Sequence, residues 1–266
     1  GSISAYDITI NTQGEHLSNQ SQQNSIQIFS KHNLTIESGA IDNTKGKLVG
    51  KNTINITSDG DLNNQQGQIS STHSLDITTN SLNNAQGQIS SNKAITVTSD
   101  NNIDNTEGKI EGRDSIRIEN NGQFNNTLGE IIGKNSVGIL SQGDLINYKG
   151  RLGSEKSSVT LNTYKIDNRY GVISAQSTLE LDSNKYTINN TDTSQSGGIV
   201  SQKNIILKSG ELNNEKGHLI AKTDLNIDTH QQKIINNNGI ISADNGMLTV
   251  DSTAINNISG LIYSLK

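Results

Sequence analysis

Hydrophobic and polar residues follow one phrase that recurs about every 21 residues along this chain. The phrase is apolar-x-Asn-x-x-Gly-x-apolar, and Leu62–Ile69 is a typical copy. Ten copies keep this spacing, and two others, Leu17–Ile28 and Ile188–Ile199, are longer by four residues. A pattern repeated at a fixed period predicts a stacked-repeat architecture in which each unit contacts its neighbours.

Two polar positions of the phrase hold the same residue type throughout. The asparagines are Asn19, Asn43, Asn64, Asn84, Asn105, Asn126, Asn147, Asn168, Asn190, Asn214, Asn236 and Asn257. The glycines are Gly46, Gly67, Gly87, Gly108, Gly129, Gly150, Gly171, Gly197, Gly217, Gly239 and Gly260. Successive glycines are 20 to 22 residues apart, except for a step of 26 across the second long copy. The spacing alone therefore defines the repeat length.

Each repeat also carries an apolar-x-apolar triplet, about six residues after the Gly-x-apolar element. Leu75–Ile77 and Ile95–Val97 are examples, and most triplets are rich in Ile, Leu and Val. Alternation with β-branched enrichment is typical of short strands that bury one face. No apolar stripe at helical spacing runs long enough to predict a helix. A repeat therefore predicts three short strands joined by turns.

A single repeat is too small to fold alone. About four apolar side chains would point inward, and each contributes roughly 1.5–3 kcal/mol when buried. Ordering about 20 residues costs about 1–2 kcal/mol each in backbone entropy. Stacking the repeats lets every strand pair above and below at about 4.8 Å. We therefore predict an all-β parallel β-helix of about twelve coils, forming a single elongated domain over residues 1–266.

The repeated Asn and Gly are predicted to have structural roles. An Asn side chain both donates and accepts, so identical residues stacked at strand spacing can form an internal ladder. Glycine three residues later suits a turn that needs φ > 0 or a close backbone approach. Neither position predicts a ligand.

The long copies and the tyrosines are the candidates for binding. Insertions in a solenoid map to one face, which is often the binding face, although a tolerated loop is the simpler explanation. Exposed tyrosines grouped on one face could form a contact patch, or they could be unrelated surface residues. The candidate binding residues are Thr191, Asp192, Thr193, Ser194, Gln195, Tyr148 and Tyr170.

Composition excludes several other classes. Hydrophobic residues make up 30% of the chain and aromatic residues 3%, which also suits a disordered chain, but strict periodicity argues against disorder. A net charge of −5 with scattered Lys and Arg gives no basic stripe for nucleic acid. There is no cysteine, and the five histidines do not cluster. We predict no metal, no cofactor and no enzyme activity, because no set of carboxylates gathers in the sequence.

The repeat units resemble the haemagglutinin repeats of filamentous haemagglutinin-type exoproteins. The resemblance rests on the twelve copies of apolar-x-Asn-x-x-Gly-x-apolar and the triplets that follow them, and it covers essentially the whole chain. It implies a right-handed parallel β-helix in a surface filament of Gram-negative bacteria. Such exoproteins are adhesins and contact-dependent growth inhibition toxins, exported by two-partner secretion through an outer-membrane pore.

The resemblance therefore implies a secreted, cell-surface protein with a structural function. We expect a non-enzymatic shaft that presents a distal adhesive or toxic element to other cells. The alternative is an adhesin module that binds a receptor or glycan on a target cell through its inserted turns. We expect the chain to be an excised piece of a longer protein and a monomer in isolation.

Overall fold

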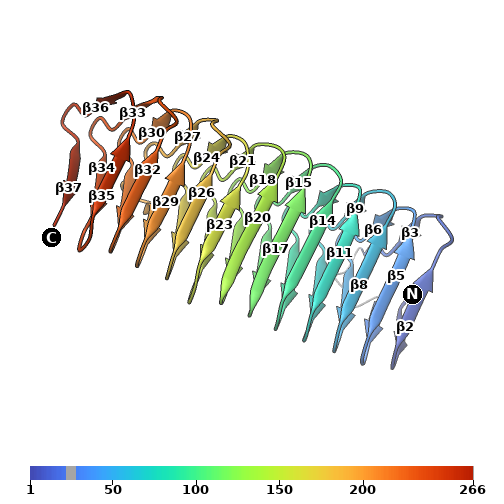
Figure 1. Cartoon of the computed structure of the whole chain (residues 1–266). Coiled ribbons are helices and arrows are strands. Elements are labelled where there is room, and N and C mark those ends of the chain that lie inside the picture. Colours follow the sequence, from blue (N-terminus) through green and yellow to red (C-terminus); the bar gives the residue numbers. More distant parts are fainter. Residues whose placement is uncertain (22–27, 266) are drawn as a thin grey trace. The chain divides into compact units, whose positions relative to one another are not determined.

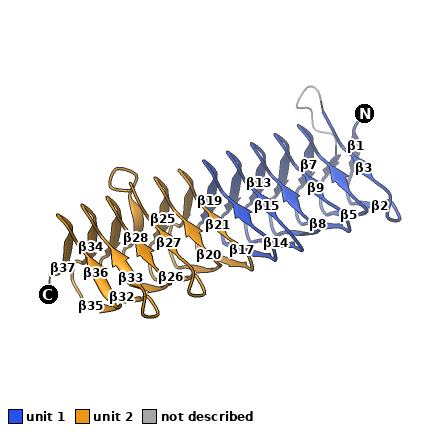
Figure 2. Ribbon diagram, turned by 90° about the horizontal axis from the view of Figure 1, so that it is seen from above, with its two compact units in different colours: residues 1–133 blue, residues 134–266 orange. Residues whose placement is uncertain are grey.

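The computed structural model describes residues 1–21 and 28–265. By its internal contacts the chain divides into two compact units, residues 1–133 and 134–266, which Figure 2 shows in different colours. Each unit is described by itself, and the single elongated domain stays a prediction. The four-residue extension of the first long copy falls mainly on residues 22–27, outside the described residues.

Unit 1 consists of short strands in three parallel sheets. The first sheet contains β1 (Ile3–Ala5), β4 (Ile28–Ser30), β7 (Lys47–Gly50), β10 (Gln68–Ser71), β13 (Gln88–Ser91), β16 (Lys109–Gly112) and β19 (Glu130–Gly133). The second contains β2 (Ile8–Asn11), β5 (Leu34–Ser38), β8 (Ile54–Ser58), β11 (Leu75–Thr79), β14 (Ile95–Ser99) and β17 (Ser115–Asn120). The third contains β3 (Leu17–Ser18), β6 (Ile41–Asp42), β9 (Leu62–Asn63), β12 (Leu82–Asn83), β15 (Ile103–Asp104) and β18 (Phe124–Asn125).

Unit 2 repeats the same three sheets. The first contains β22 (Arg151–Ser154), β25 (Val172–Ala175), β28 (Gly198–Ser201), β31 (His218–Ala221), β34 (Ile240–Ala243) and β37 (Leu261–Ser264). The second contains β20 (Ser136–Ser141), β23 (Val159–Asn162), β26 (Leu179–Asp182), β29 (Ile205–Lys208), β32 (Leu225–Asp228) and β35 (Leu248–Asp251). The third contains β21 (Leu145–Ile146), β24 (Ile166–Asp167), β27 (Ile188–Asn189), β30 (Leu212–Asn213), β33 (Lys233–Ile235) and β36 (Ala254–Asn256).

Strands pair in register with the strand one repeat away. In unit 1, Ile69 of β10 pairs with Leu48 on one side and Ile89 on the other. Figure 1 shows the second-sheet strands of each unit lying side by side, each from a different repeat. The predicted all-β parallel β-solenoid, with about twelve coils and no helix in the described residues, is confirmed. Its right-handedness stays a prediction.

Each coil buries a small set of aliphatic side chains. Leu62, Ile69, Leu75 and Ile77 of one coil are at most 1% exposed, while the residues between them in β11 face solvent. This inside–outside alternation follows from the two-residue period of a strand. The neighbouring coils place the same residue types at the same positions, so the core is narrow and continuous within each unit.

Candidate functional site

The repeated asparagines form a row of side chains that we call the inner row, and all of them except Asn257 are buried. Asn64 Nδ2 donates to Asn84 Oδ1 at 2.7 Å. The same amide approaches the carbonyl oxygens of Gly67 at 3.5 Å and Gln88 at 3.4 Å. In unit 1 each asparagine side chain donates to the next one in the series Asn19, Asn43, Asn64, Asn84, Asn105 and Asn126. In unit 2 the series is Asn147, Asn168, Asn190, Asn214, Asn236 and Asn257.

Every bond of the inner row points the same way, with each amide donating to the next coil. Asn105, for example, accepts from Asn84 and donates to Asn126, and its side chain is 0% exposed. Buried polar groups are costly unless they are hydrogen-bonded. The row satisfies each interior amide with the coil before it and the coil after it.

The turn glycines are required by close approach. A Cβ built on Gly108 would lie 2.3 Å from the backbone oxygen of Asn84 and 2.6 Å from Asn105 Oδ1. Gly67, Gly87, Gly129, Gly171, Gly217, Gly239 and Gly260 meet the equivalent backbone oxygen of the preceding coil. Of the two reasons that the sequence suggested, positive φ does not apply to these residues. Gly197 of the long turn is different, with φ +116° and no backbone atom close to its Cβ position.

Positive φ falls instead on the residue two positions after each inner-row Asn from Asn43 to Asn257, which in a turn of normal length is the residue just before the glycine. We call these residues the outer row. In unit 1 they are Lys45, Gln66, Gln86, Glu107 and Leu128, with φ between 53° and 56°. In unit 2 they are Lys149, Tyr170, Asp192, Lys216, Asn238 and Ser259, with φ between 49° and 57°. Backbone bonds such as Gln66 N to Ala85 O, 3.0 Å, hold the row in place.

Outer-row side chains in unit 1 bond to one another. Gln66 Nε2 donates to Gln86 Oε1 at 2.7 Å, and Gln86 Nε2 donates to Glu107 Oε2 at 2.8 Å. Adjacent coils place equivalent side chains about 4.8 Å apart, so long polar residues reach their neighbours. This part of the row is closed on itself.

In unit 2 the outer row includes an exposed aromatic ring that its neighbours hold. Tyr170 and Tyr148 pack edge to face, with ring centres 5.7 Å apart and planes at 86°. Lys149 Nζ lies 5.4 Å and 5.8 Å from the two ring centres, at cation–π distance. Arg169 lies over Tyr148 and is bound by the carboxylate of Asp167, which raises the pKa of the guanidinium. These contacts fix the direction of the Tyr170 ring.

The second long copy adds residues 193–196 to the turn between Asp192 and Gly197. The register places Val172 opposite Gly198, so the coil regains its rung directly after the extra residues. Thr193 Oγ1 accepts from His218 N at 3.0 Å and donates to Asn190 O at 3.2 Å. Ser196 Oγ donates to Gly171 O at 3.2 Å. Two hydroxyl groups thus bind the backbone groups that a turn of normal length would have paired.

The long turn and the outer row together line a pocket of about 360 Å³. We call it the insert pocket. Its lining consists of Tyr170, Asp192, Ser194, Gln195, Ser196, Lys216 and Asn238. Four of these are successive members of the outer row, and three belong to the extra residues of the turn. All seven residues lie in unit 2.

Comparison with protein families gives one match, to the haemagglutinin repeat, over residues 3–66, 62–185 and 182–264. The chain belongs to the haemagglutinin-repeat family. Proteins of this family are structural or adhesive. No curated protein and no solved structure matches the chain.

The haemagglutinin repeats bring some of the predicted binding residues together and separate others. Asp192, Ser194, Gln195 and Tyr170 line the insert pocket, and Tyr148 supports the ring of Tyr170. Thr191 and Thr193 are 9% and 0% exposed, so they belong to the rung and not to the surface. Three lining residues were not predicted: Ser196, Lys216 and Asn238. Counting back one residue from each turn glycine would have placed Lys216 and Asn238 in the same row as Tyr170.

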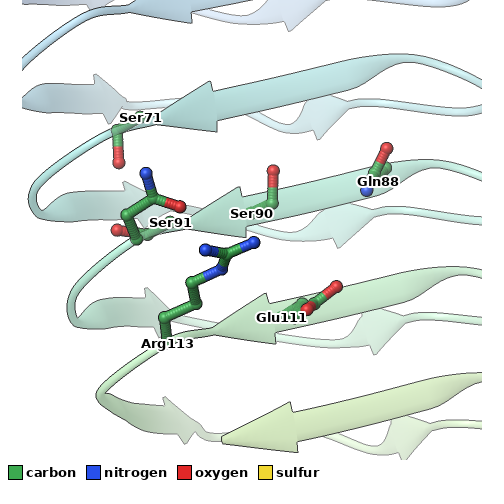
Figure 3. A pocket seen from close by; sticks show the side chains of 7 residues that line it. Ser71, Gln88, Ser90, Ser91, Glu111 and Arg113 are labelled. Carbon is green, nitrogen blue, oxygen red and sulfur yellow. The ribbon is translucent and has the colours of Figure 1, made fainter. Parts of the chain in front are cut away.

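A smaller pocket of about 180 Å³ lies in unit 1 and is polar throughout. Figure 3 shows Ser71, Gln88, Ser90, Ser91, Glu111 and Arg113 around it, on strands of the first sheet and the turns that follow them. Ser71 Oγ is buried without a hydrogen-bond partner. The pocket has no aromatic side chain and no inserted turn, which makes it a useful contrast to the insert pocket.

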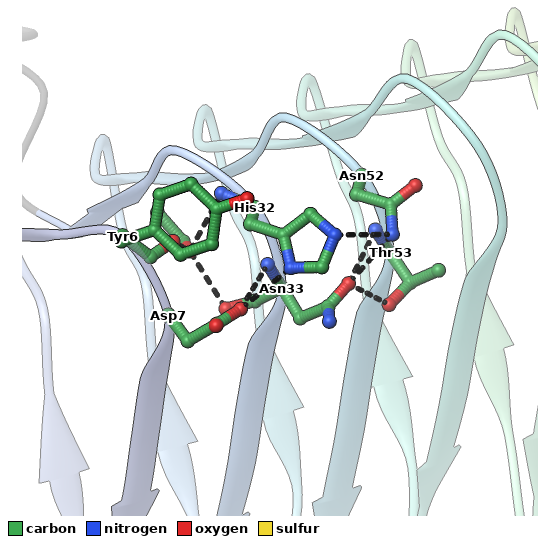
Figure 4. A network of polar contacts seen from close by, with 7 residues as sticks. Tyr6, Asp7, His32, Asn33, Asn52 and Thr53 are labelled. Carbon is green, nitrogen blue, oxygen red and sulfur yellow. Dashed lines mark hydrogen bonds and ion pairs between the residues drawn. The ribbon is translucent and has the colours of Figure 1, made fainter.

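A polar network ties the first coils of unit 1 together, as Figure 4 shows. Asp7 Oδ1 accepts from Asn33 N at 3.0 Å and lies 2.8 Å from His32 Nδ1, and His32 stacks on Tyr6. The Asn33 N–H, together with His32, lowers the pKa of Asp7. Asn52 Nδ2 donates to Asn33 Oδ1 at 2.8 Å. The network links successive coils.

Histidines and carboxylates do not gather into a metal site. Among residues 1–21 and 28–265, no group of three or more His, Asp or Glu side chains is placed to hold a metal ion. Partial burial lowers the pKa of His218 on β31, so this ring favours its neutral form. In the same part of the chain, no helix has the length and hydrophobicity needed to cross a membrane.

Proposed function

We propose that this chain is a non-enzymatic structural shaft of a secreted bacterial surface filament, which presents a distal adhesive or toxic element to other cells. The observation that carries the proposal is the inner row, in which every coil of a unit is bound to the next by a buried amide. Membership of the haemagglutinin-repeat family, whose proteins are typically secreted to the cell surface, supports it.

The mechanism is mechanical. Each coil adds backbone bonds in three sheets and one inner-row bond, so a load along the stack is shared between many groups. Because the repeats are equivalent, their number sets the length of the shaft at about 4.8 Å per coil. The proposal includes export by two-partner secretion through an outer-membrane pore, which suits a chain without disulfides.

Deletion of one whole repeat tests the shaft. Removing residues 68–87 joins Gly67 to Gln88, which holds the position of Gln68 in the register. We expect this variant to fold with a β-type circular dichroism spectrum and to keep the unfolding force of the full chain in single-molecule pulling. Removing residues 68–77 is the matched control, because it deletes β10 and joins the turn glycine Gly67 to Thr78 near the end of β11, so the coil loses its first-sheet strand. Equal loss of force in both variants would contradict the proposal.

A second function is favoured by a specific observation, the insert pocket. An exposed aromatic ring and several polar side chains converge there. This supports a module that binds a receptor or glycan, and a shaft can carry such a site on its side.

A further inference from the structure

We propose that the insert pocket binds one neutral pyranose ring of a glycan. The inference rests on the second function above and names its ligand class. The size of the pocket is suitable, because its volume of about 360 Å³ lies within the usual range for small-ligand sites.

Four polar side chains of the pocket are not used by the protein itself. Within the described residues, no hydrogen bond or ion pair engages the side chains of Asp192, Gln195, Lys216 or Asn238. The outer row of unit 1 behaves differently, since Gln66, Gln86 and Glu107 bond to each other. Three members of the outer row in unit 1 therefore bond to one another, whereas Asp192, Lys216 and Asn238 in unit 2 are open to a ligand.

Two opposite charges define what the pocket accepts. Asp192 and Lys216 are neighbours in the outer row, and Asp192 N donates to Glu215 O at 3.0 Å across the two coils. A carboxylate accepts from one hydroxyl group, while an ammonium group donates to another. Neighbouring hydroxyls of a sugar satisfy both, and the amides of Gln195 and Asn238 can each donate and accept. The balance of charge does not favour an anion.

The remaining wall supplies an apolar face. Tyr170 is 44% exposed, and Tyr148 and Lys149 hold its ring in one orientation. A pyranose has one face of C–H groups, which packs on an aromatic ring while the hydroxyls at its edge reach polar side chains. A peptide strand would instead require an unpaired strand edge, and the turns here lie between paired strands.

The pocket is held in shape before any ligand arrives. Thr193 and Ser196 fix the two ends of the extra turn through their hydroxyl groups, so Ser194 and Gln195 are the only tip residues between them. A preorganised site loses less entropy on binding. For one sugar ring we expect a Kd on the order of 1 mM, as its few atoms allow.

The test is titration of the whole 266-residue chain with single sugars, followed by saturation-transfer NMR. The probes are the methyl pyranosides of glucose, galactose and mannose, with methyl glucuronide and inorganic phosphate as the anionic arms. We expect at least one neutral glycoside to saturate. Tyr170→Ala and Asp192→Asn should each weaken the affinity for that glycoside about tenfold or more, as expected when a polar or aromatic contact with the ligand is lost. Tyr170→Phe should keep binding within about twofold, because the ring face remains.

Tyr186→Ala is the matched control, because Tyr186 is also exposed and stacks on Tyr164 outside the pocket. The affinity of this variant for the neutral glycoside should equal that of the unmodified chain. No saturable binding of any neutral glycoside would overturn the inference, and so would unchanged binding in Tyr170→Ala. Binding of phosphate or glucuronide alone, lost in Lys216→Met, would make the pocket an anion site and overturn it too. None of these variants alters the inner row. Absence of glycan binding would therefore not contradict the shaft proposal, which the pulling experiment tests separately.

Discussion

From Asn43 to Asn257 the inner and outer rows lie two residues apart in each turn, yet they differ in composition and burial. The inner row is Asn in all twelve copies, and its side chains, buried in every copy except the last, Asn257, are bonded from coil to coil. The outer row contains lysine, glutamine, glutamate, leucine, tyrosine, aspartate, asparagine and serine, all with positive φ. The comparison teaches that the fold depends on the identity of one row only. The other row is free to vary and can acquire a binding function.

The largest expected effect comes from filling the space beside the inner row. Gly108→Ala would place a methyl group 2.3 Å from the backbone oxygen of Asn84, and backbone in a paired coil cannot move aside. We expect a loss of about 3 kcal/mol in the free energy of unfolding.

Gly138→Ala is the control for that measurement. Gly138 lies in β20, where an added Cβ meets no atom within 4 Å. Its effect in urea unfolding should stay within about 1 kcal/mol. Similar losses in the two variants would show that close approach is not the reason for glycine in the turn.

The second prediction removes one member of each row. Asn105→Ala removes the acceptor of an Asn84 Nδ2 hydrogen bond and the donor to Asn126 Oδ1 inside the protein. We expect a loss of roughly 1–3 kcal/mol in the free energy of unfolding. Gln86→Ala, in the outer row, removes exposed hydrogen bonds and should change it by about 0.5 kcal/mol or less. Chemical denaturation of both variants checks the contrast, and equal changes would mean that the two rows contribute alike.

The smallest expected effect has the opposite sign. Leu128 is exposed and has φ 56°, a conformation that a bulky side chain disfavours and glycine accepts. Leu128→Gly should raise the free energy of unfolding by up to about 1 kcal/mol. Leu140 is equally exposed but lies in β20, so Leu140→Gly should lower it by roughly 0.5–1 kcal/mol. A fall in both variants, seen in thermal and urea unfolding, would show that the outer row carries no strain.

The repeat, its three strands and the positions of the asparagines could be predicted from the sequence, because strand alternation and a fixed period depend on local chemistry. The position of positive φ could not. A glycine in a turn suggests positive φ at the glycine itself. Here glycine is required because a Cβ would clash with the backbone oxygen of the previous coil, and residues such as Lys45 and Leu128 adopt the left-handed conformation.

The insert pocket shows a second limit of the sequence. The extra residues and Tyr170 were visible in the pattern, but the path of the long turn was not. That path depends on the hydroxyl groups of Thr193 and Ser196, which take the place of backbone partners in neighbouring coils. These long-range contacts, together with the Ser194 N–H that donates to Lys216 O at 3.2 Å, direct Ser194 and Gln195 toward Lys216 and Asn238.

The common direction of the inner-row bonds favours formation of the coils in order from the N-terminus to the C-terminus. Each Asn amide donates toward the C-terminal neighbour, as Asn64 does to Asn84. A folded coil therefore offers its successor an aligned N–H group before that successor has formed. A chain that emerges from its N-terminus would add coils one by one on such a template, as a vectorial process in which every finished layer specifies the position of the next.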